Sequence, residues 1–133
     1  MSGTAKSHIA EQVCGDYVCG LAPVAARWIG LLTVASTDAP GTGTEVSGGA
    51  YARQLITFGA GVNQTISGRL YANTNLIAWA TATANWGTIA QYAVYDALTA
   101  GNKIFADAMP GTPTIVTGQT PSLPVGAVTY LED

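Results

Sequence analysis

The chain has 133 residues, of which 48% are hydrophobic and only 10% are charged, and its formal net charge is −3. This length fits one domain with an ordinary core. Soluble domains are typically about 25% charged, so a chain with this composition is expected to hide uncharged surface against a membrane or against other protein subunits.

Neither a membrane nor a nucleic acid is the expected partner. A membrane-spanning helix needs about 20 consecutive apolar residues, whereas the longest apolar run, residues 28–34, lies between Arg27 and Ser36. The first residues lack the apolar stretch of a signal peptide, so we expect neither a signal peptide nor an anchor. The five basic residues are scattered, although phosphate binding requires them to be clustered. Burial against other subunits is therefore the favoured explanation.

Residues 5–20 carry a weak helical pattern, with apolar side chains at intervals of three and four. Gly20 and Pro23 end it. A short helix with one apolar face must lie against its own sheet or a neighbouring subunit, so residues 1–26 are expected to form an N-terminal helical arm. The candidate inter-subunit contacts in this arm are Ile9, Val13 and Tyr17.

Cys14 and Cys19 also fall in this arm. A spacing of five does not match the paired cysteines of zinc sites, and on a helix it places the two side chains about 140° apart, which opposes a disulfide. Both are expected to be small apolar residues of a reduced fold. The single histidine, His8, follows Ser7, but adjacency in sequence does not make a catalytic triad. We expect no metal, no cofactor and no catalytic residue.

The pattern of residues 27–117 predicts strands joined by turns, which form the core of the domain. The run 28–34 is apolar on both faces, as expected of a central strand. Residues 38–49 are rich in glycine and predict a loop, and residues 96–102 predict a turn. Further strands are predicted at residues 54–58, 64–71, 75–83, 86–95, 103–108 and 114–117.

The final segment, residues 118–133, is expected to be an extended C-terminal arm. Pro110, Pro113, Pro121 and Pro124 fall within fifteen residues, and proline cannot donate a hydrogen bond to a neighbouring strand. This segment is expected along a sheet edge, with a last short strand at residues 125–131. Candidate inter-subunit contacts here are Pro121, Pro124, Val125 and Tyr130.

Seven or eight short strands at regular spacing favour one all-β domain over residues 1–133. We expect an antiparallel β-sandwich or jelly-roll-like barrel with a short N-terminal helix.

Two sets of side chains suggest a small-molecule site, and each has a simpler interpretation. Glu45 and Asp96 lie near strand ends, as the paired carboxylates of a glycosidase would. A turn role for Asp96 and a loop-surface or arginine-paired role for Glu45 are favoured. The aromatic residues suit a sugar-stacking platform, although aromatics at strand spacing usually belong to the core. These aromatics are Trp28, Trp79, Trp86, Tyr92 and Tyr95.

Three runs carry a family resemblance. The most specific is residues 43–53, Gly-Thr-Glu-Val-Ser-Gly-Gly-Ala-Tyr-Ala-Arg; the others are residues 27–33 with the turn at 37–41, and residues 84–96. They resemble a family of small virion proteins of tailed bacteriophages, labelled as capsid decoration (cement) proteins or as tail-associated proteins. Residues 1–26 and 110–133 match it poorly.

The resemblance implies a structural virion protein without enzymatic activity, made in the host cytoplasm. From it we expect a decoration protein that binds the major capsid protein outside the head, stabilises capsomer junctions and forms a homotrimer. The composition agrees, because permanent interfaces are poor in charge. The alternatives are a tail-tip or tail-fibre-associated subunit and, from the aromatics, a carbohydrate-binding module.

Overall fold

The computed structural model describes residues 26–39, 41–63 and 68–132. Within these ranges the chain contains twelve strands and no helix, and every strand pair is antiparallel. The all-β, antiparallel fold predicted from the sequence is confirmed. The helix expected over residues 5–20 lies outside the described residues.

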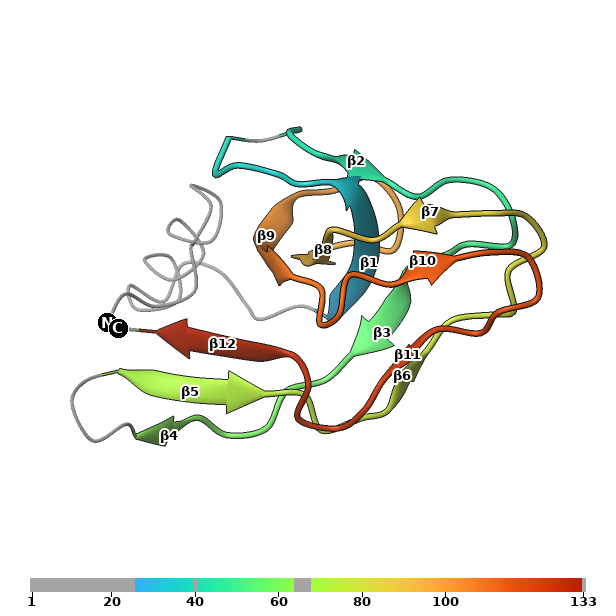
Figure 1. Ribbon diagram of the computed structural model, residues 1–133. Coiled ribbons are helices and arrows are strands. Elements are labelled where there is room, and N and C mark those ends of the chain that lie inside the picture. The colour runs from blue at the N-terminus through green and yellow to red at the C-terminus, as the bar shows by residue number, and fades with distance from the viewer. Residues whose placement is uncertain (1–25, 40, 64–67, 133) are drawn as a thin grey trace.

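The largest sheet is built around β1 (Arg27–Val34), which pairs with β2 (Thr44–Glu45) and β3 (Gln54–Ile56) on one side and with β8 (Gln91–Tyr95) on the other. β9 (Lys103–Ala108) continues the sheet beyond β8. The run from residue 28 to 34 is therefore a central strand, as its apolar faces predicted (Figure 1).

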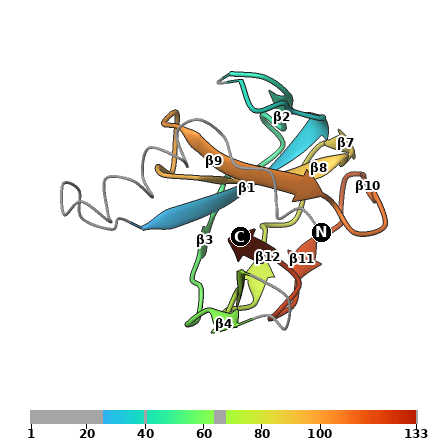
Figure 2. The same cartoon turned by 90° about the vertical axis from the view of Figure 1, so that its left-hand side faces the viewer.

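Three smaller sheets complete the fold: β12–β5–β4, β11–β6 and β10–β7. Figure 2 shows β1, β8 and β9 above, with β4, β11 and β12 below. The strands of these sheets are β4 (Val62–Asn63), β5 (Arg69–Ala72), β6 (Ile77–Ala78), β7 (Gly87–Thr88), β10 (Thr114–Ile115), β11 (Ser122–Leu123) and β12 (Thr129–Glu132).

One hydrophobic core joins the large sheet to the smaller ones. Ile29 and Val94 from the large sheet belong to the same buried cluster as Trp79, Ile89 and Val128 from the other layer. Full burial of each such side chain contributes roughly 1.5–3 kcal/mol. The two layers are thus held together mainly by apolar contact.

The C-terminal segment is part of this core, and the boundary expected at residue 117 does not appear in the described residues. β12 pairs with β5 along its whole length, and Leu123 and Val128 are buried. The buried Asn73 also holds this segment: its Oδ1 accepts from the Val128 N–H at 2.9 Å and its Nδ2 donates to the Pro124 carbonyl at 3.1 Å. The prolines are tolerated because their carbonyls still accept hydrogen bonds.

The strand predicted at residues 86–95 is divided into β7 and β8. The N–H of Ile89 donates to the Pro113 carbonyl just before β10, while the N–H of Ala90 donates to the Leu32 carbonyl in the large sheet. The chain therefore crosses from the β10–β7 sheet to the large sheet between these two residues. The residue pattern gives no sign of such a crossing, because side chains of both sheets, such as Ile115 and Val94, belong to the same core.

The other predicted strands differ in detail. Residues 103–108 form β9 as predicted, whereas the strand predicted at 75–83 is reduced to β6. Of residues 64–71, predicted as one strand, the described part is 68–71, and β5 takes up residues 69–71 of it. The predicted loop at 38–49 contains β2.

Candidate functional site

Residues 43–53, which we call the signature loop, fold into a compact turn against β1. Gly48, Gly49 and Ala50 all have positive φ, at 75°, 61° and 67°. A Cβ on Gly49 would lie 2.8 Å from Nε1 of Trp86, whose indole N–H donates to the Gly49 carbonyl at 2.9 Å. The paired glycines are required because this turn needs left-handed backbone and lies directly on a tryptophan ring.

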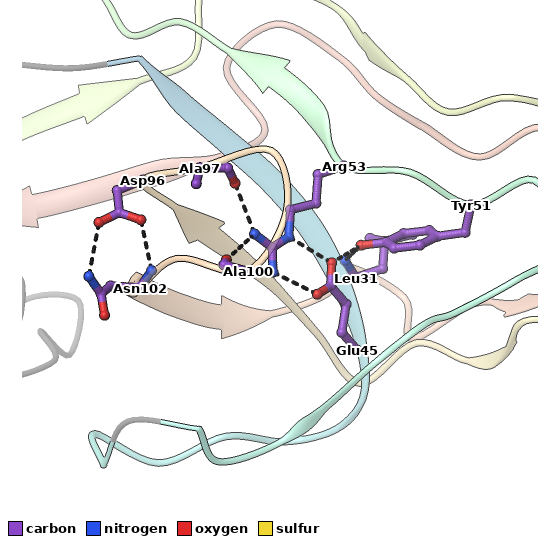
Figure 3. A network of polar contacts seen from close by, with 8 residues as sticks. All are labelled: Leu31, Glu45, Tyr51, Arg53, Asp96, Ala97, Ala100 and Asn102. Atoms are coloured by element: carbon purple, nitrogen blue, oxygen red, sulfur yellow. Dashed lines mark hydrogen bonds and ion pairs between the residues drawn. The ribbon is translucent and has the colours of Figure 1, made fainter.

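The two ends of the signature loop are joined by an ion pair. Arg53 Nη2 donates to Glu45 Oε1 at 2.8 Å, and Arg53 Nε donates to Glu45 Oε2 at 2.9 Å (Figure 3). Only 8% of the Arg53 side chain and 25% of the Glu45 side chain are exposed. A two-point arginine–carboxylate contact of this kind fixes the relative orientation of the two side chains in addition to pairing their charges. The arginine-paired role predicted for Glu45 is confirmed.

Arg53 also binds the turn that follows β8. Its Nη1 donates to the carbonyls of Ala97 and Ala100 at 2.8 and 2.7 Å, and its guanidinium lies 3.5 Å from the ring centroid of Tyr95. Asp96 closes the same turn, because its carboxylate accepts from the N–H and the side-chain amide of Asn102. The turn role predicted for Asp96 is confirmed.

Tyr51 connects this network to the centre of the large sheet. Its hydroxyl donates to Glu45 Oε2 at 2.5 Å and accepts from the N–H of Leu31 at 2.9 Å. Burial, followed by the hydrogen bond to Glu45, raises the pKa of Tyr51 far above its usual value. A Cβ on Gly30 would lie 2.6 Å from both the Tyr51 hydroxyl and Glu45 Oε2. Glycine in the middle of β1 therefore makes room for the network.

These contacts make the network a structural clamp. Burial alone would lower the pKa of Arg53, but the hydrogen bonds and charge of Glu45 outweigh it and raise that pKa. Both carboxylate oxygens of Glu45 are held by Arg53 and Tyr51, and Asp96 is committed to its own turn. The glycosidase pairing of Glu45 with Asp96 is therefore not formed. The presence of Glu45, Tyr51 and Arg53 in one short glycine-rich run was the signal for this clamp, but the sequence predicted only an arginine partner for Glu45.

The described part of the chain offers no metal site. It holds no group of three His, Cys, Asp or Glu residues that could hold a metal ion. It also has no helix long and apolar enough to cross a membrane. His8, Cys14 and Cys19 lie outside the described residues.

The proposed sugar platform is not exposed. Trp79, Trp86, Tyr92 and Tyr95 are at most 8% exposed, and only Trp28 of this set is partly exposed. Trp86 meets Tyr51 edge to face with 5.4 Å between ring centroids. The interpretation of these four residues as a stacking surface is wrong, because they fill the core.

The predicted inter-subunit contacts have different environments. Ile9, Val13 and Tyr17 lie outside the described residues. Tyr130 packs on Phe105, with 4.9 Å between ring centroids, and donates to Glu132. Pro121 and Pro124 accept hydrogen bonds from Trp79 and Asn73, whereas Val125 is 61% exposed. A role for any of them between subunits stays a prediction.

One comparison with known proteins gives a match. A family model described as "Podophage GP4 fiber I protein gp80" matches residues 1–130, which is nearly the whole chain. The match includes the signature loop and both other runs that carried the resemblance. No curated protein matches the chain significantly.

Proposed function

Since the chain belongs to the family of the podophage GP4 fiber I protein gp80, and is thus a structural protein of a tailed-phage particle, we propose that it is a subunit of a tail fibre. The observation that carries this proposal is the family match over residues 1–130, whose description names a fiber protein. Of the two virion locations considered from the sequence, the tail fibre fits that description better than the capsid exterior does.

The contacts between distant segments of the chain support a mechanical role. Three buried or partly buried polar side chains, Arg53, Glu45 and Asn73, are all used to fasten one part of the chain to another. A fibre subunit has to keep its shape while neighbouring subunits pull on it. Bonds that cross between the signature loop, β1 and the turn after β8 resist such deformation, because they must break together.

The partners of this protein are then other fibre subunits. The scarcity of charge, which first suggested docking to a capsid, suits any permanent contact between subunits equally well. We propose neither nucleic acid nor membrane as a partner.

Labelling of intact particles tests the proposal. Gold-labelled antibody against this chain should bind the tail fibres in electron micrographs, and antibody against the major capsid protein should mark the heads as the control. Labelling spread over the head shell would contradict a fibre location and restore the capsid-decoration hypothesis.

A further inference from the structure

Two segments of the described chain that lie side by side carry no charged side chain. Residues 70–95 and 108–131 contain no Asp, Glu, Lys or Arg. They lie side by side because β6 pairs with β11 and β7 pairs with β10. Figure 1 shows these four strands and their loops on the side of the molecule opposite the end of β12. We call residues 77–89 and 113–123 the uncharged end.

The uncharged end is one continuous ribbon rather than two separate strand pairs. Backbone N–H groups of Trp79, Ala82 and Trp86 donate to carbonyls of the second segment at 2.8 to 3.0 Å. Side chains on the inner side of the ribbon, such as Trp79 and Ile115, are buried in the core. Its outer side is therefore held in a fixed shape.

The outer side presents hydroxyl groups that are already paired with one another. Thr88 and Thr114 share a hydrogen bond of 2.8 Å, and Thr81 and Thr120 share one of 2.7 Å; all four residues are exposed. Val116 adds an apolar side chain that is 42% exposed. The free energy of removing such a surface from water is much lower than that of removing a charged surface. Its paired hydroxyl groups keep their hydrogen-bond partners when water is excluded.

The charged residues of the described chain all lie in other segments, and the net charge of −3 makes identical copies repel one another. Contact through the uncharged end brings no like charges together, and the central part of protein interfaces is depleted in charge. The charged residues elsewhere are Arg27, Asp38, Glu45, Arg53, Arg69, Asp96, Lys103, Asp107 and Glu132.

We propose that the uncharged end is the surface through which copies of this chain pack against each other. This inference rests on the proposed function, because a fibre is assembled from repeated subunits. The occupant is a second copy, whose own uncharged end offers a neutral, hydroxyl-bearing surface of the same kind.

Light scattering over a range of concentrations tests this directly. The mass of the wild-type chain should rise above the monomer mass of 13.6 kDa, and Thr114→Glu or Thr120→Glu should weaken association more than about tenfold. Thr114→Ser, which adds no charge and keeps the hydroxyl that pairs with Thr88, should leave association unchanged. Thr74→Glu is the matched control, because Thr74 is also exposed and shares a 2.9 Å hydroxyl contact with Thr57 away from the uncharged end.

Three results would overturn the inference: a wild-type chain that stays monomeric at every concentration, glutamate variants that associate as strongly as the wild type, or equal loss in Thr74→Glu. Circular dichroism confirms that each variant is folded. A monomeric chain that antibody still locates on fibres contradicts this inference alone, whereas its absence from fibres contradicts the proposed function.

Discussion

Arg53 and Glu45 stand eight residues apart in sequence and face each other through two hydrogen bonds of 2.8 and 2.9 Å. The same arginine reaches the carbonyls of Ala97 and Ala100, and the same carboxylate holds Tyr51. One ion pair thus fastens the signature loop to β1 and to the turn after β8. The residues that carry the family resemblance are the ones that form this clamp.

Arg53→Ala should lower the free energy of unfolding by about 3 kcal/mol, at the lower end of the cost of breaking a buried pair, because Glu45 keeps some contact with water. Arg53→Lys should recover little, since lysine cannot form the two-point contact and reach both carbonyls. Urea denaturation measures both. The exposed Arg69→Ala is the control and should cost less than about 1 kcal/mol. Equal stability of Arg53→Ala and Arg69→Ala would contradict the clamp.

Stability should decline at alkaline pH through the buried tyrosines. Burial raises the pKa of Tyr92 and of Tyr95 to about 12, against about 10 in an unfolded chain. Below about pH 10 both states hold the phenol protons, and the stabilisation is complete. Between about pH 10 and 12 the unfolded chain releases protons that the folded chain keeps, so the free energy of unfolding falls as the pH rises.

Denaturation at a series of pH values, with tyrosinate absorbance followed in parallel, measures this effect. Tyr92→Phe is the matched variant, because it keeps most of the ring packing and removes one ionisable group, and its stability should fall less steeply with pH. If the free energy of unfolding of Tyr92→Phe falls with pH as steeply as that of the wild type, Tyr92 does not contribute to the loss of stability at alkaline pH.

Trp79 and Trp86 should respond differently to replacement by phenylalanine. The Trp86 N–H donates to the Gly49 carbonyl, whereas the Trp79 N–H is buried without a partner among the described residues. Both variants lose side-chain volume from the core, but only Trp86→Phe loses a hydrogen bond and leaves the Gly49 carbonyl without the indole donor. Trp86→Phe should therefore be less stable than Trp79→Phe by about 1 kcal/mol in thermal or urea unfolding. The reverse order would contradict these assignments.

Deletion of residues 118–133 should prevent folding. The deletion removes β11 and β12, leaves β6 without a partner strand and β5 with β4 alone, and takes Leu123 and Val128 out of the core. Far-UV circular dichroism and proteolysis measure the outcome. Val125→Ala, at an exposed position in the same segment, is the control and should fold normally. A truncated chain that stays folded would show that the segment is a separate arm after all.

The sequence predicted the fold class and several strands because hydrophobic pattern and turn residues are local properties. β1 and β9 follow their patterns closely. The crossing between β7 and β8 could not be predicted. It depends on which distant segments accept the hydrogen bonds of Ile89 and Ala90, and a local pattern does not record this. The edge position and the last short strand predicted for the C-terminal segment agree with β12, which lies at the edge of its sheet. The strands that pair with this segment could not be read from its own residues.

The candidate site was partly predictable. A carboxylate and an arginine in one glycine-rich run suggest an ion pair, and Asp96 before Gly101-Asn102 suggests a turn. The roles of Gly30 and Tyr51 depend on β1 and the signature loop coming within contact distance, which no local pattern records. Likewise, only strand pairing reveals that two uncharged segments form a single surface.

The central claim is that this chain is a subunit of a tail fibre, and separation of heads from tails tests it most directly. Quantitative mass spectrometry of the two fractions should find the chain with the tails, in far fewer copies than the major capsid protein. Recovery of the chain with tailless heads, in numbers comparable to the shell subunit, would contradict the account.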